Sequence, residues 1–406
     1  MKLAAVIAEY NPFHNGHKHH LGLTRKLTDA THVMVLLSGG FVQRGGPAVA
    51  DKWTRARMAL DGGADLVCEL PYIFAGSGAE AFADGAVSIL EATRTVDVLS
   101  FGSECADISA LKSVADVLAG EPDNFSCALK HALNQGMGFA AARAEALKTI
   151  LGVDAAQILK EPNNILAVEY LKAMGKKRCG FAAAAVERKG AAHHSERPED
   201  GFFASAKTIR ACLAKGDIAT AARFVPYPAE ILNDLHVSDI EKRYDNAVLA
   251  RLSACDLRDI RALPDVSEGL EFAVKNALSG ANTARDIVDL ASSKRIPKSR
   301  LRRAIAHLIM AADEEEMTAL RRVPPYLRVL AMNDKGRDVV KTIKSRSDMP
   351  ILTNLRANQT KLSDAQRKVL DFDIKATDLQ SLFSGSFRYH RDYTKNPVLM
   401  IEINKK

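Results

Sequence analysis

The stretch that most constrains the fold of this 406-residue chain lies near its N-terminus, in residues 3–21. It opens with an apolar run, Leu3 to Ala8, which has the length and residue types of a buried parallel strand. The dipeptide Asn11-Pro12 ends that strand with a turn. Side chains then recur at spacings of three and four, which predicts an amphipathic helix with His14 and His17 at its mouth.

The segment His14-Asn15-Gly16-His17 therefore predicts an anion site. The first turn of a helix has backbone N–H groups without partners and the positive end of the dipole, so a phosphate chain docks there. Gly16 lets phosphate approach the backbone, and histidines at i and i+3 can donate to phosphoryl oxygens during attack at an α-phosphorus. This favours adenylylation chemistry. The alternative is that both histidines merely cap the helix and satisfy local hydrogen bonds.

Composition sets broad limits. With 47% hydrophobic residues the chain can bury a large core in two or three domains, and its net charge of +7 permits an acidic partner such as RNA. Its six cysteines are scattered without Cys-x-x-Cys spacing, which predicts reduced structural thiols and no zinc site. We find no signal peptide and no apolar run of the roughly 18 residues that span a membrane. We therefore expect a cytoplasmic protein without a membrane partner.

Strand and helix patterns alternate along the first half of the chain. Strands are predicted at 31–37, 64–70, 96–101 and 178–186. Helices are predicted at 52–60, from the segment 77–80 to about 92, and through most of 107–173. Ser77 and Glu80 have the capping-box spacing for the second of these helices. This alternation predicts a parallel sheet.

Loops at the carboxyl ends of such strands line the ligand crevice. Arg44, in a glycine-rich loop after the second strand, is a candidate for phosphate or a small carboxylate, or else a solvated arginine. Gly102 could let adenosine pack against bare backbone, or be a turn glycine. Asn163 or Asn164 is the expected N-cap of a helix, and residues 187–190 follow the last strand on the ligand side.

A polar segment, residues 191–204, is predicted to be a mobile loop that leads into a helix opened by Ser205-Ala206-Lys207-Thr208-Ile209-Arg210. Ser205 or Thr208 can cap that helix and contact phosphate. Arg210 offers a forked cation to departing pyrophosphate. By itself the spacing Ser-x-x-x-x-Arg is common by chance.

Pro226 and Pro228 mark a change of character, so we predict a domain boundary near 225. Residues 1–225 would form the nucleotide-binding catalytic domain, and residues 226–406 a mainly helical domain without strands until its last few residues. Its run 294–303 has six basic residues and no acid, and Arg321, Arg328 and others follow it. Such runs are usually solvated faces, but without balancing acids they also resemble a footprint for RNA phosphates. The candidates are Lys294, Arg295, Lys298, Arg300, Arg302 and Arg303.

The His-x-Gly-His pattern after a first strand resembles the HIGH-type nucleotidyltransferase and class I aminoacyl-tRNA synthetase superfamily. The longer string from Ala8 to His17, with Ser38 to Gly45, more specifically resembles the bacterial tRNA cytidine acetate ligase family. That similarity extends through Asp51-Lys52-Trp53, Phe101 to Glu104, Glu161 to Asn164 and the 294–303 run, and so covers most of the chain. Ser205 to Arg210 resembles the second nucleotidyltransferase signature, with Lys207 where the family usually has a small residue.

The resemblance implies a Rossmann-like parallel sheet with a mainly helical C-terminal domain. It implies an enzyme that uses ATP, with Mg²⁺, to activate acetate as acetyl-adenylate and then acetylates the wobble cytidine of elongator methionine tRNA to N4-acetylcytidine. The catalytic residues would be His14, His17 and Arg210. The nucleotide contacts would be Ile7, Ala8, Glu9, Tyr10, Asn11, Pro12, Phe13, His14, Asn15, Gly16, His17, Lys18, His19, His20, Gly102, Asn163, Arg188, Ser205 and Thr208.

Two other functions fit the same motif. One is a small-molecule adenylyltransferase, although a small acceptor does not require the long helical region or its basic run. The other is a non-catalytic RNA-binding scaffold, which predicts ATP-independent tRNA binding and no effect of changing His14.

Overall fold

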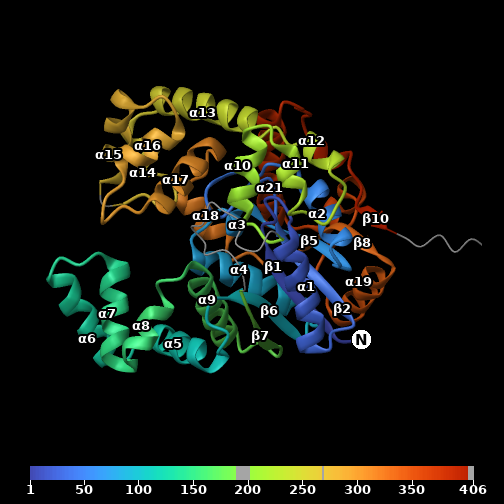
Figure 1. Ribbon diagram of the computed structural model, residues 1–406, viewed down its shortest axis with the longest axis horizontal. Helices are drawn as coiled ribbons and strands as arrows, with labels where there is room; N and C mark the ends of the chain where they lie inside the picture. The colour runs from blue at the N-terminus through green and yellow to red at the C-terminus, as the bar shows by residue number, and fades with distance from the viewer. Residues whose placement is uncertain (189–201, 268, 401–406) are drawn as a thin grey trace, which may run out of the picture.

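The computed structural model describes residues 1–188, 202–267 and 269–400, and Figure 1 shows a central sheet with two groups of helices that project from it. The first half of the chain contains β1 (Leu3–Ala8), α1 (Asn15–Thr28), β2 (His32–Ser38), β3 (Phe41–Val42), β4 (Gly46–Pro47), α2 (Lys52–Asp61), β5 (Leu66–Leu70), α3 (Tyr72–Ala75), α4 (Ala79–Ala92), β6 (Val98–Ser103), α5 (Ile108–Gly120), α6 (Asp123–Asn134), α7 (Phe139–Leu151), α8 (Val153–Ile158), α9 (Pro162–Lys177) and β7 (Ala182–Glu187).

The second half is mainly helical and adds three strands. It contains α10 (Ala206–Ala214), α11 (Ile218–Ala222), α12 (Glu230–Asn233), α13 (Val237–Ala254), α14 (Leu257–Arg261), α15 (Leu270–Ala277), α16 (Ala284–Ala291), α17 (Lys298–Met310), α18 (Glu314–Leu320), β8 (Leu327–Asn333), α19 (Asp334–Arg346), β9 (Ile351–Leu352), α20 (Leu355–Asn358), α21 (Asp364–Ser384) and β10 (Val398–Met400), with short 3₁₀ turns at Leu278–Gly280, Gln359–Lys361 and Arg391–Tyr393. No helix in the described ranges is long and apolar enough to cross a membrane.

The main sheet has the strand order β10-β8-β5-β2-β1-β6-β7, and β9 pairs with β8. The five strands from β5 to β7 in this order are parallel, whereas β8 is antiparallel to β5. The chain starts in the middle at β1, moves outward to β5 and then returns to β6 beside β1. Ligand crevices in open α/β sheets lie at such a reversal, outside the carboxyl ends of the strands. The predicted parallel α/β fold is therefore confirmed, with its crevice beyond β1 and β6.

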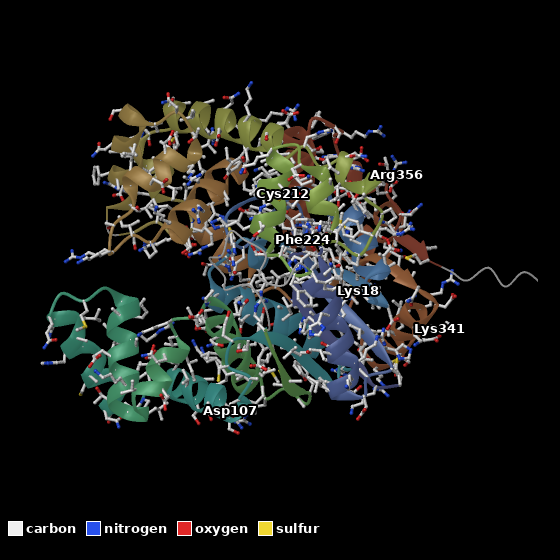
Figure 2. All side chains as sticks on the ribbon, in the orientation of Figure 1. Lys18, Asp107, Cys212, Phe224, Lys341 and Arg356 are labelled. Atoms are coloured by element: carbon white, nitrogen blue, oxygen red, sulfur yellow. The ribbon has the colours of Figure 1, made fainter. Side chains whose placement is uncertain are left out.

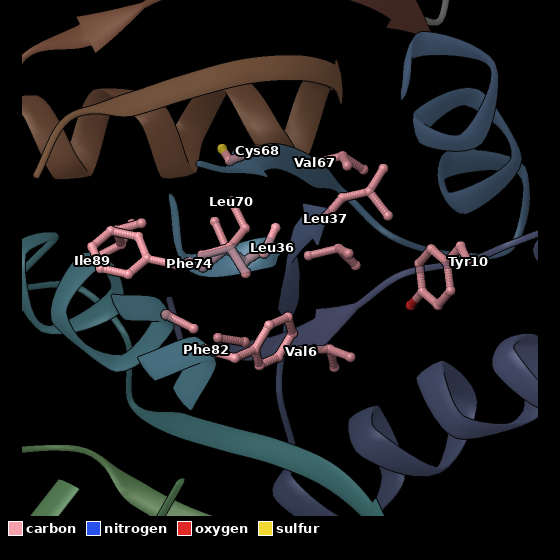
Figure 3. Close-up of a cluster of buried hydrophobic side chains, with 14 of the residues drawn as sticks. Val6, Tyr10, Leu36, Leu37, Val67, Cys68, Leu70, Phe74, Phe82 and Ile89 are labelled. Carbon is pink, nitrogen blue, oxygen red and sulfur yellow. The ribbon is translucent and has the colours of Figure 1, made fainter. Parts of the chain in front are cut away.

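The strands form because their apolar runs can be buried on both faces. Val6, Leu36 and Val67, from three neighbouring strands, are at most 2% exposed. Figure 3 shows Leu36 beside Leu70 and Phe74, the latter from α3, whereas Val67 lies beside Leu37. Right-handed crossovers place α1 and α2 on one face of the sheet and α4 and α9 on the other, because the chain reverses direction after β5. The core therefore holds β1, β2 and β5 in place from both faces of the sheet.

Several local predictions need correction. Ser77 does not cap α4, since the N-cap is Gly78 and the Ser77 hydroxyl donates to the Ile73 carbonyl at 2.6 Å. The N-cap of α9 is Glu161, so neither Asn163 nor Asn164 occupies that position. In both places a short helix or a turn just upstream, which the local sequence pattern does not reveal, changes where the next helix begins.

The region after residue 225 was predicted to lack strands until its last few residues, and this is wrong. β8 lies inside the main sheet beside β5, and β9 and β10 pair with it. The apolar run of β8 is interrupted by Arg328, which the sequence analysis grouped with basic residues of a solvated face or an RNA footprint. Arg328 is instead 4% exposed and pairs with Glu69 at 3.5 Å and with Asp392. Buried partners from distant segments explain how an arginine can lie in a central strand.

A buried charge network joins this region to the first half of the chain. The Lys52 ammonium lies 2.7 Å from Glu69 and 2.7 Å from Asp392, and all three side chains are almost fully buried. Asp373 of α21 lies in the same interior, where it accepts from the Tyr326 hydroxyl at 2.7 Å. Burial raises the pKa of Asp373 to about 7. The helices from α13 to α17, by contrast, surround a second core of their own.

Candidate active site

The histidine motif lies where β1 passes into α1. His14 is the N-cap of α1, and its Nδ1 accepts from the Gly16 N–H at 3.1 Å. The backbone N–H of His14 in turn donates to Nδ1 of His17 at 3.2 Å, which completes a capping box. The two imidazoles stack with their centroids 3.6 Å apart. A Cβ at residue 16 would stand 2.9 Å from the His14 ring, so Gly16 makes room for that ring.

Capping accounts for only one nitrogen of each ring. A neutral imidazole whose Nδ1 accepts a hydrogen bond carries its proton on Nε2. Burial, with smaller effects of the Arg188 and Arg210 charges, lowers the pKa of His14 to about 3. Burial, followed by the neighbouring His14, lowers the pKa of His17 well below its ordinary value. Both rings are therefore neutral near pH 7, and each keeps an Nε2–H donor for a ligand, so capping and ligand binding are compatible.

His20 provides a test of these electrostatics, because burial and Arg188 lower its pKa to about 4. In the unfolded chain a histidine takes up its proton near pH 6.5, well before the folded His20 does. The stabilisation from neutral His20 is therefore complete above pH 6.5 and declines as the pH falls towards 4. We expect the difference in unfolding free energy between wild type and His20→Gln to narrow from pH 7 to pH 5 in urea titrations. A constant difference would contradict the pKa shift.

Arg210 reaches the site from α10. Ser205 caps this helix by accepting from the Thr208 N–H at 3.1 Å, as predicted, and the two hydroxyls lie 2.9 Å apart. One turn later the Arg210 guanidinium donates to the Asn11 carbonyl at 2.6 Å, in the turn that precedes His14. Burial lowers the pKa of Arg210, and the Glu9 carboxylate opposes that shift. Lys207 is exposed on the first turn of α10.

Arg188 lies against the predicted adenosine glycine. A Cβ at Gly102 would stand 3.4 to 3.6 Å from three side-chain atoms of Arg188, so the two residues are in contact across β6 and β7. Arg44 is exposed. Partial burial is the larger cause of the lowered pKa of Arg188, as burial is for Arg210, and the charge of Arg44 lowers the pKa of both further. The mutual repulsion of these arginines is relieved when a polyanionic ligand binds among them, so the arrangement favours such a ligand.

The N-terminus of α9 is fastened to the end of β6 by Glu104. Its carboxylate accepts from the Asn164 backbone N–H at 3.0 Å and from the Asn163 side-chain amide. The Asn164 side chain accepts in turn from the Ser103 hydroxyl at 2.6 Å. Asn163 therefore contacts Glu104, two residues after Gly102, and the Glu104 carboxylate, not an asparagine cap, binds the N-terminus of α9.

The predicted contacts within residues 7–20 divide into two groups. Some are structural: Tyr10 and Phe13 are buried, with the Tyr10 ring 4.7 Å from His17. The Asn15 amide donates to two carbonyls beyond residue 201, and its backbone N–H donates to the Phe224 carbonyl at 2.8 Å. Figure 2 labels Phe224 and Lys18 close to this junction. Asn11, Pro12 and His14 are buried as well. The other predicted contacts are partly or fully accessible: Ile7, Ala8, Glu9, Gly16, His17, Lys18, His19 and His20.

One important residue was missed. Arg55 of α2 is fully buried and donates to the carbonyls of Glu9 at 2.7 Å, Ser38 at 2.9 Å and Gly39. It thereby ties together the carboxyl ends of β1 and β2, which carry the site. The only signal in the sequence is an arginine on the apolar side of a helix. Of the predicted mobile loop, residues 191–201 lie outside the described residues.

The basic run begins before α17 and continues into its first two turns. Lys294, Arg295 and Arg302 are exposed. Acids from elsewhere balance two of its other charges, because Lys298 lies 2.7 Å from Asp289 and Arg303 lies 2.6 Å from Asp265. The expectation that the run has no balancing acids is therefore wrong for these two residues, and Arg300 donates to the Asp265 carbonyl at 2.7 Å.

Comparison with known proteins agrees with this geometry. Residues 1–395 match the model of the family described as HIGH Nucleotidyl Transferase, so fold and site define a protein of the nucleotidyl transferase class. The crystal structure of Thermotoga maritima TmcAL bound with alpha-thio ATP is similar to this structure, with a TM-score of 0.88 and 29% sequence identity. The match covers 99% of this chain and 100% of that chain.

Two curated relatives have names that specify a particular reaction within this class. The tRNA(Met) cytidine acetate ligase of Clostridium perfringens (strain SM101 / Type A) is 35% identical over 98% of this chain and all of its own length. The tRNA(Met) cytidine acetate ligase of Clostridium kluyveri (strain ATCC 8527) is 37% identical over 99% of this chain and all of its own length. The chain therefore belongs to the HIGH nucleotidyl transferase family, among the tRNA(Met) cytidine acetate ligases.

Proposed function

We propose that this chain is an ATP-dependent ligase that activates acetate as acetyl-adenylate and acetylates the wobble cytidine of elongator methionine tRNA to N4-acetylcytidine. The observation that carries the proposal is the stacked, neutral pair His14 and His17 at the α1 N-terminus, with Arg210 and Arg188 beside it. Full-length similarity to proteins named for this reaction supports the choice of acid and acceptor.

In the first step an acetate oxygen attacks the α-phosphorus of ATP, and the bond to the β-phosphate oxygen breaks. The Nε2–H groups of His14 and His17 donate to the oxygens of the α-phosphorus, where negative charge grows in the transition state. Arg210 receives the departing pyrophosphate, with Ser205 and Thr208 at the same helix N-terminus. Arg188 and Gly102, together with Asn163, border the adenosine. The products are acetyl-adenylate and pyrophosphate.

In the second step the exocyclic amine of cytidine attacks the acetyl carbonyl carbon. The bond between that carbon and the phosphate oxygen breaks, AMP leaves, and the amine loses a proton to water. Because adenylate is a good leaving group and the amine lone pair is delocalised into the ring, positioning of the base supplies much of the rate.

Magnesium belongs to the proposal only through the nucleotide. Residues 1–188, 202–267 and 269–400 hold no group of three His, Cys, Asp or Glu side chains arranged to bind a metal ion. Mg²⁺ is commonly held by substrate phosphates and water with few protein ligands. The phosphates of ATP would therefore supply its ligands, and no step above relies on a protein-bound metal.

The boundary predicted near residue 225 separates two functions in this proposal. Residues 1–225 carry the chemistry, and residues 226–406 bind tRNA. The basic run is well placed to deliver RNA to the site. Gly45, next to Arg44, has a φ of 78°, and a Cβ there would stand 2.4 Å from the Arg302 backbone. The glycine-rich loop after β2, which contains Arg44 and Gly45, is thus in direct contact with α17.

Exposed charges of the run should set the salt dependence of tRNA binding. We expect Lys294→Ala, Arg295→Ala and Arg302→Ala together to weaken binding and to reduce the slope of log Kd against log salt by up to about 0.7–0.9 for each phosphate that the variant no longer neutralises. The matched control removes three exposed charges from α19, Lys335, Lys341 and Lys344, on the opposite side of the molecule. An unchanged slope in the first variant, or an equal change in both, would reject the footprint.

The first step can be tested alone by exchange of labelled pyrophosphate into ATP. The proposal predicts exchange that requires acetate and does not require tRNA. Exchange only with a phosphorylated small molecule would instead indicate a small-molecule adenylyltransferase, and tRNA binding without any exchange would indicate a non-catalytic scaffold.

A further inference from the structure

A cleft of about 950 Å³ separates two groups of helices. We call α5 to α8 the inserted lobe and α14 to α17 the basic lobe, and Figure 1 shows them on opposite sides of this space. Phe139 and Arg143 of α7 line one wall, and Arg300 and Arg303 of α17 line the other. This volume lies at the upper end of the range of about 300–1,000 Å³ that ligand pockets occupy.

The cleft lies next to the nucleotide site. Glu104 fastens Asn163 and Asn164, the second and third residues of α9, to the end of β6. The following residue, Ile165, lines the cleft, and so does Glu169 one turn further on. A ligand in the cleft and a nucleotide beside Gly102 would therefore be neighbours along one helix.

The two lobes meet at the mouth of the cleft. A Cβ at Gly138 would stand 3.1 Å from the Lys294 carbonyl oxygen, so the turn before α7 touches the start of the basic run. Phe139, the next residue, is 61% exposed although it is a large aromatic side chain. An accessible aromatic ring beside exposed cations is the combination that proteins use to bind unpaired bases.

The charge inside the cleft differs from the charge at its rim. Five arginines line it, and five carboxylates line it as well, so its interior has no excess of positive charge. At the mouth, where Lys294 meets the turn before α7, Lys294 and its neighbour Arg295 are exposed, and Arg302 is exposed on α17 between the lining residues Arg300 and Arg303. Phosphates are therefore favoured at the rim, and an uncharged flat group is favoured inside.

We propose that the cleft receives unpaired bases of the anticodon loop, stacked on Phe139, while the rim holds the RNA backbone. This inference rests on the proposed function and deepens it, because it makes the inserted lobe, to which the sequence assigned no role, part of the RNA site. The target cytidine would then be presented along α9 to the activated acetyl group.

The test compares Phe139→Ala with wild type in binding to an RNA hairpin of the methionine anticodon arm. We expect Kd to rise about tenfold, with an unchanged slope against salt because the cations that meet the RNA phosphates are all retained. Phe139→Tyr, which keeps a stacking ring, should restore binding. Val153→Ala removes apolar surface from an exposed residue on the same lobe and should bind like wild type. Acetate-dependent pyrophosphate exchange should be equal in all four proteins.

Other outcomes would overturn the inference. If the wild-type protein acetylates tRNA and Phe139→Ala binds the hairpin with an unchanged Kd, the cleft is rejected as the base site and the proposed function stands. Weakened pyrophosphate exchange in Phe139→Ala would also contradict it, because the change would then reach beyond RNA. A wild-type protein that neither binds the hairpin nor acetylates tRNA would reject the function and the inference together.

Discussion

Replacement of His17 by alanine is expected to slow acetate-dependent pyrophosphate exchange by at least about 10²–10³-fold, the usual effect of removing one transition-state donor. The neutral imidazole donates from Nε2 to the α-phosphate oxygens, and alanine has no donor to replace it. The tRNA affinity should remain nearly intact, because the proposed RNA contacts are the exposed residues of the 294–303 run, which lie on α17 and in the segment before it. Exchange rates and Kd, measured on the same preparations, check both expectations.

A control must separate this role from the cap that His17 also provides. His17→Asn keeps an acceptor for the His14 N–H but lacks the Nε2 donor, so it should be nearly as slow as His17→Ala while unfolding like wild type. His131, exposed on α6 and outside the nucleotide contacts, provides the matched substitution His131→Ala, with expected exchange close to wild type. Full exchange in His17→Ala would remove the histidine from the mechanism.

Replacement of Glu69 by alanine is expected to cost about 3–5 kcal/mol of unfolding free energy. Its carboxylate lies 2.7 Å from the Lys52 ammonium and 3.5 Å from Arg328, and all three groups are buried. Without Glu69, the two buried cations would keep an ion pair with Asp392 but lose the carboxylate that contacts both of them. Since domains are commonly stable by about 5–15 kcal/mol, this single change should bring the protein close to unfolding at 37 °C.

The matched control is Asp61→Ala, which breaks a surface ion pair with Arg57 at 3.2 Å and should cost less than about 1 kcal/mol. Urea titrations of both variants, followed by circular dichroism, give the comparison. Equal midpoints for Glu69→Ala and wild type would show that the network does not hold β8 and α21 to the sheet.

Local patterns predicted much of the fold. Continuous apolar runs located β1, β2, β5, β6 and β7, because strands buried on both faces need no polar alternation. β8 was missed because Arg328 breaks its run, and its partners Glu69 and Asp392 lie far away along the chain on either side. No local pattern carries that information.

In the candidate site, too, local features could be predicted from the sequence and features that depend on distant contacts could not. The spacing of His14 and His17 and the cap at Ser205 could be read from neighbouring residues, and the structure places them as expected. The roles of Arg55 and Glu104 depend on contacts between the ends of different strands and helices, which only the folded sheet creates. The balance of the basic run by Asp265 and Asp289 was hidden for the same reason.

The central claim is acetate transfer to tRNA, and one experiment tests it most directly. The purified protein is incubated with ATP, isotopically labelled acetate and total bacterial tRNA, and the nucleosides are then analysed by mass spectrometry. The account predicts label in N4-acetylcytidine from methionine tRNA, dependent on ATP and absent with His17→Ala. Acetate-dependent exchange with no label in any cytidine would contradict it and assign the activated acid to another acceptor.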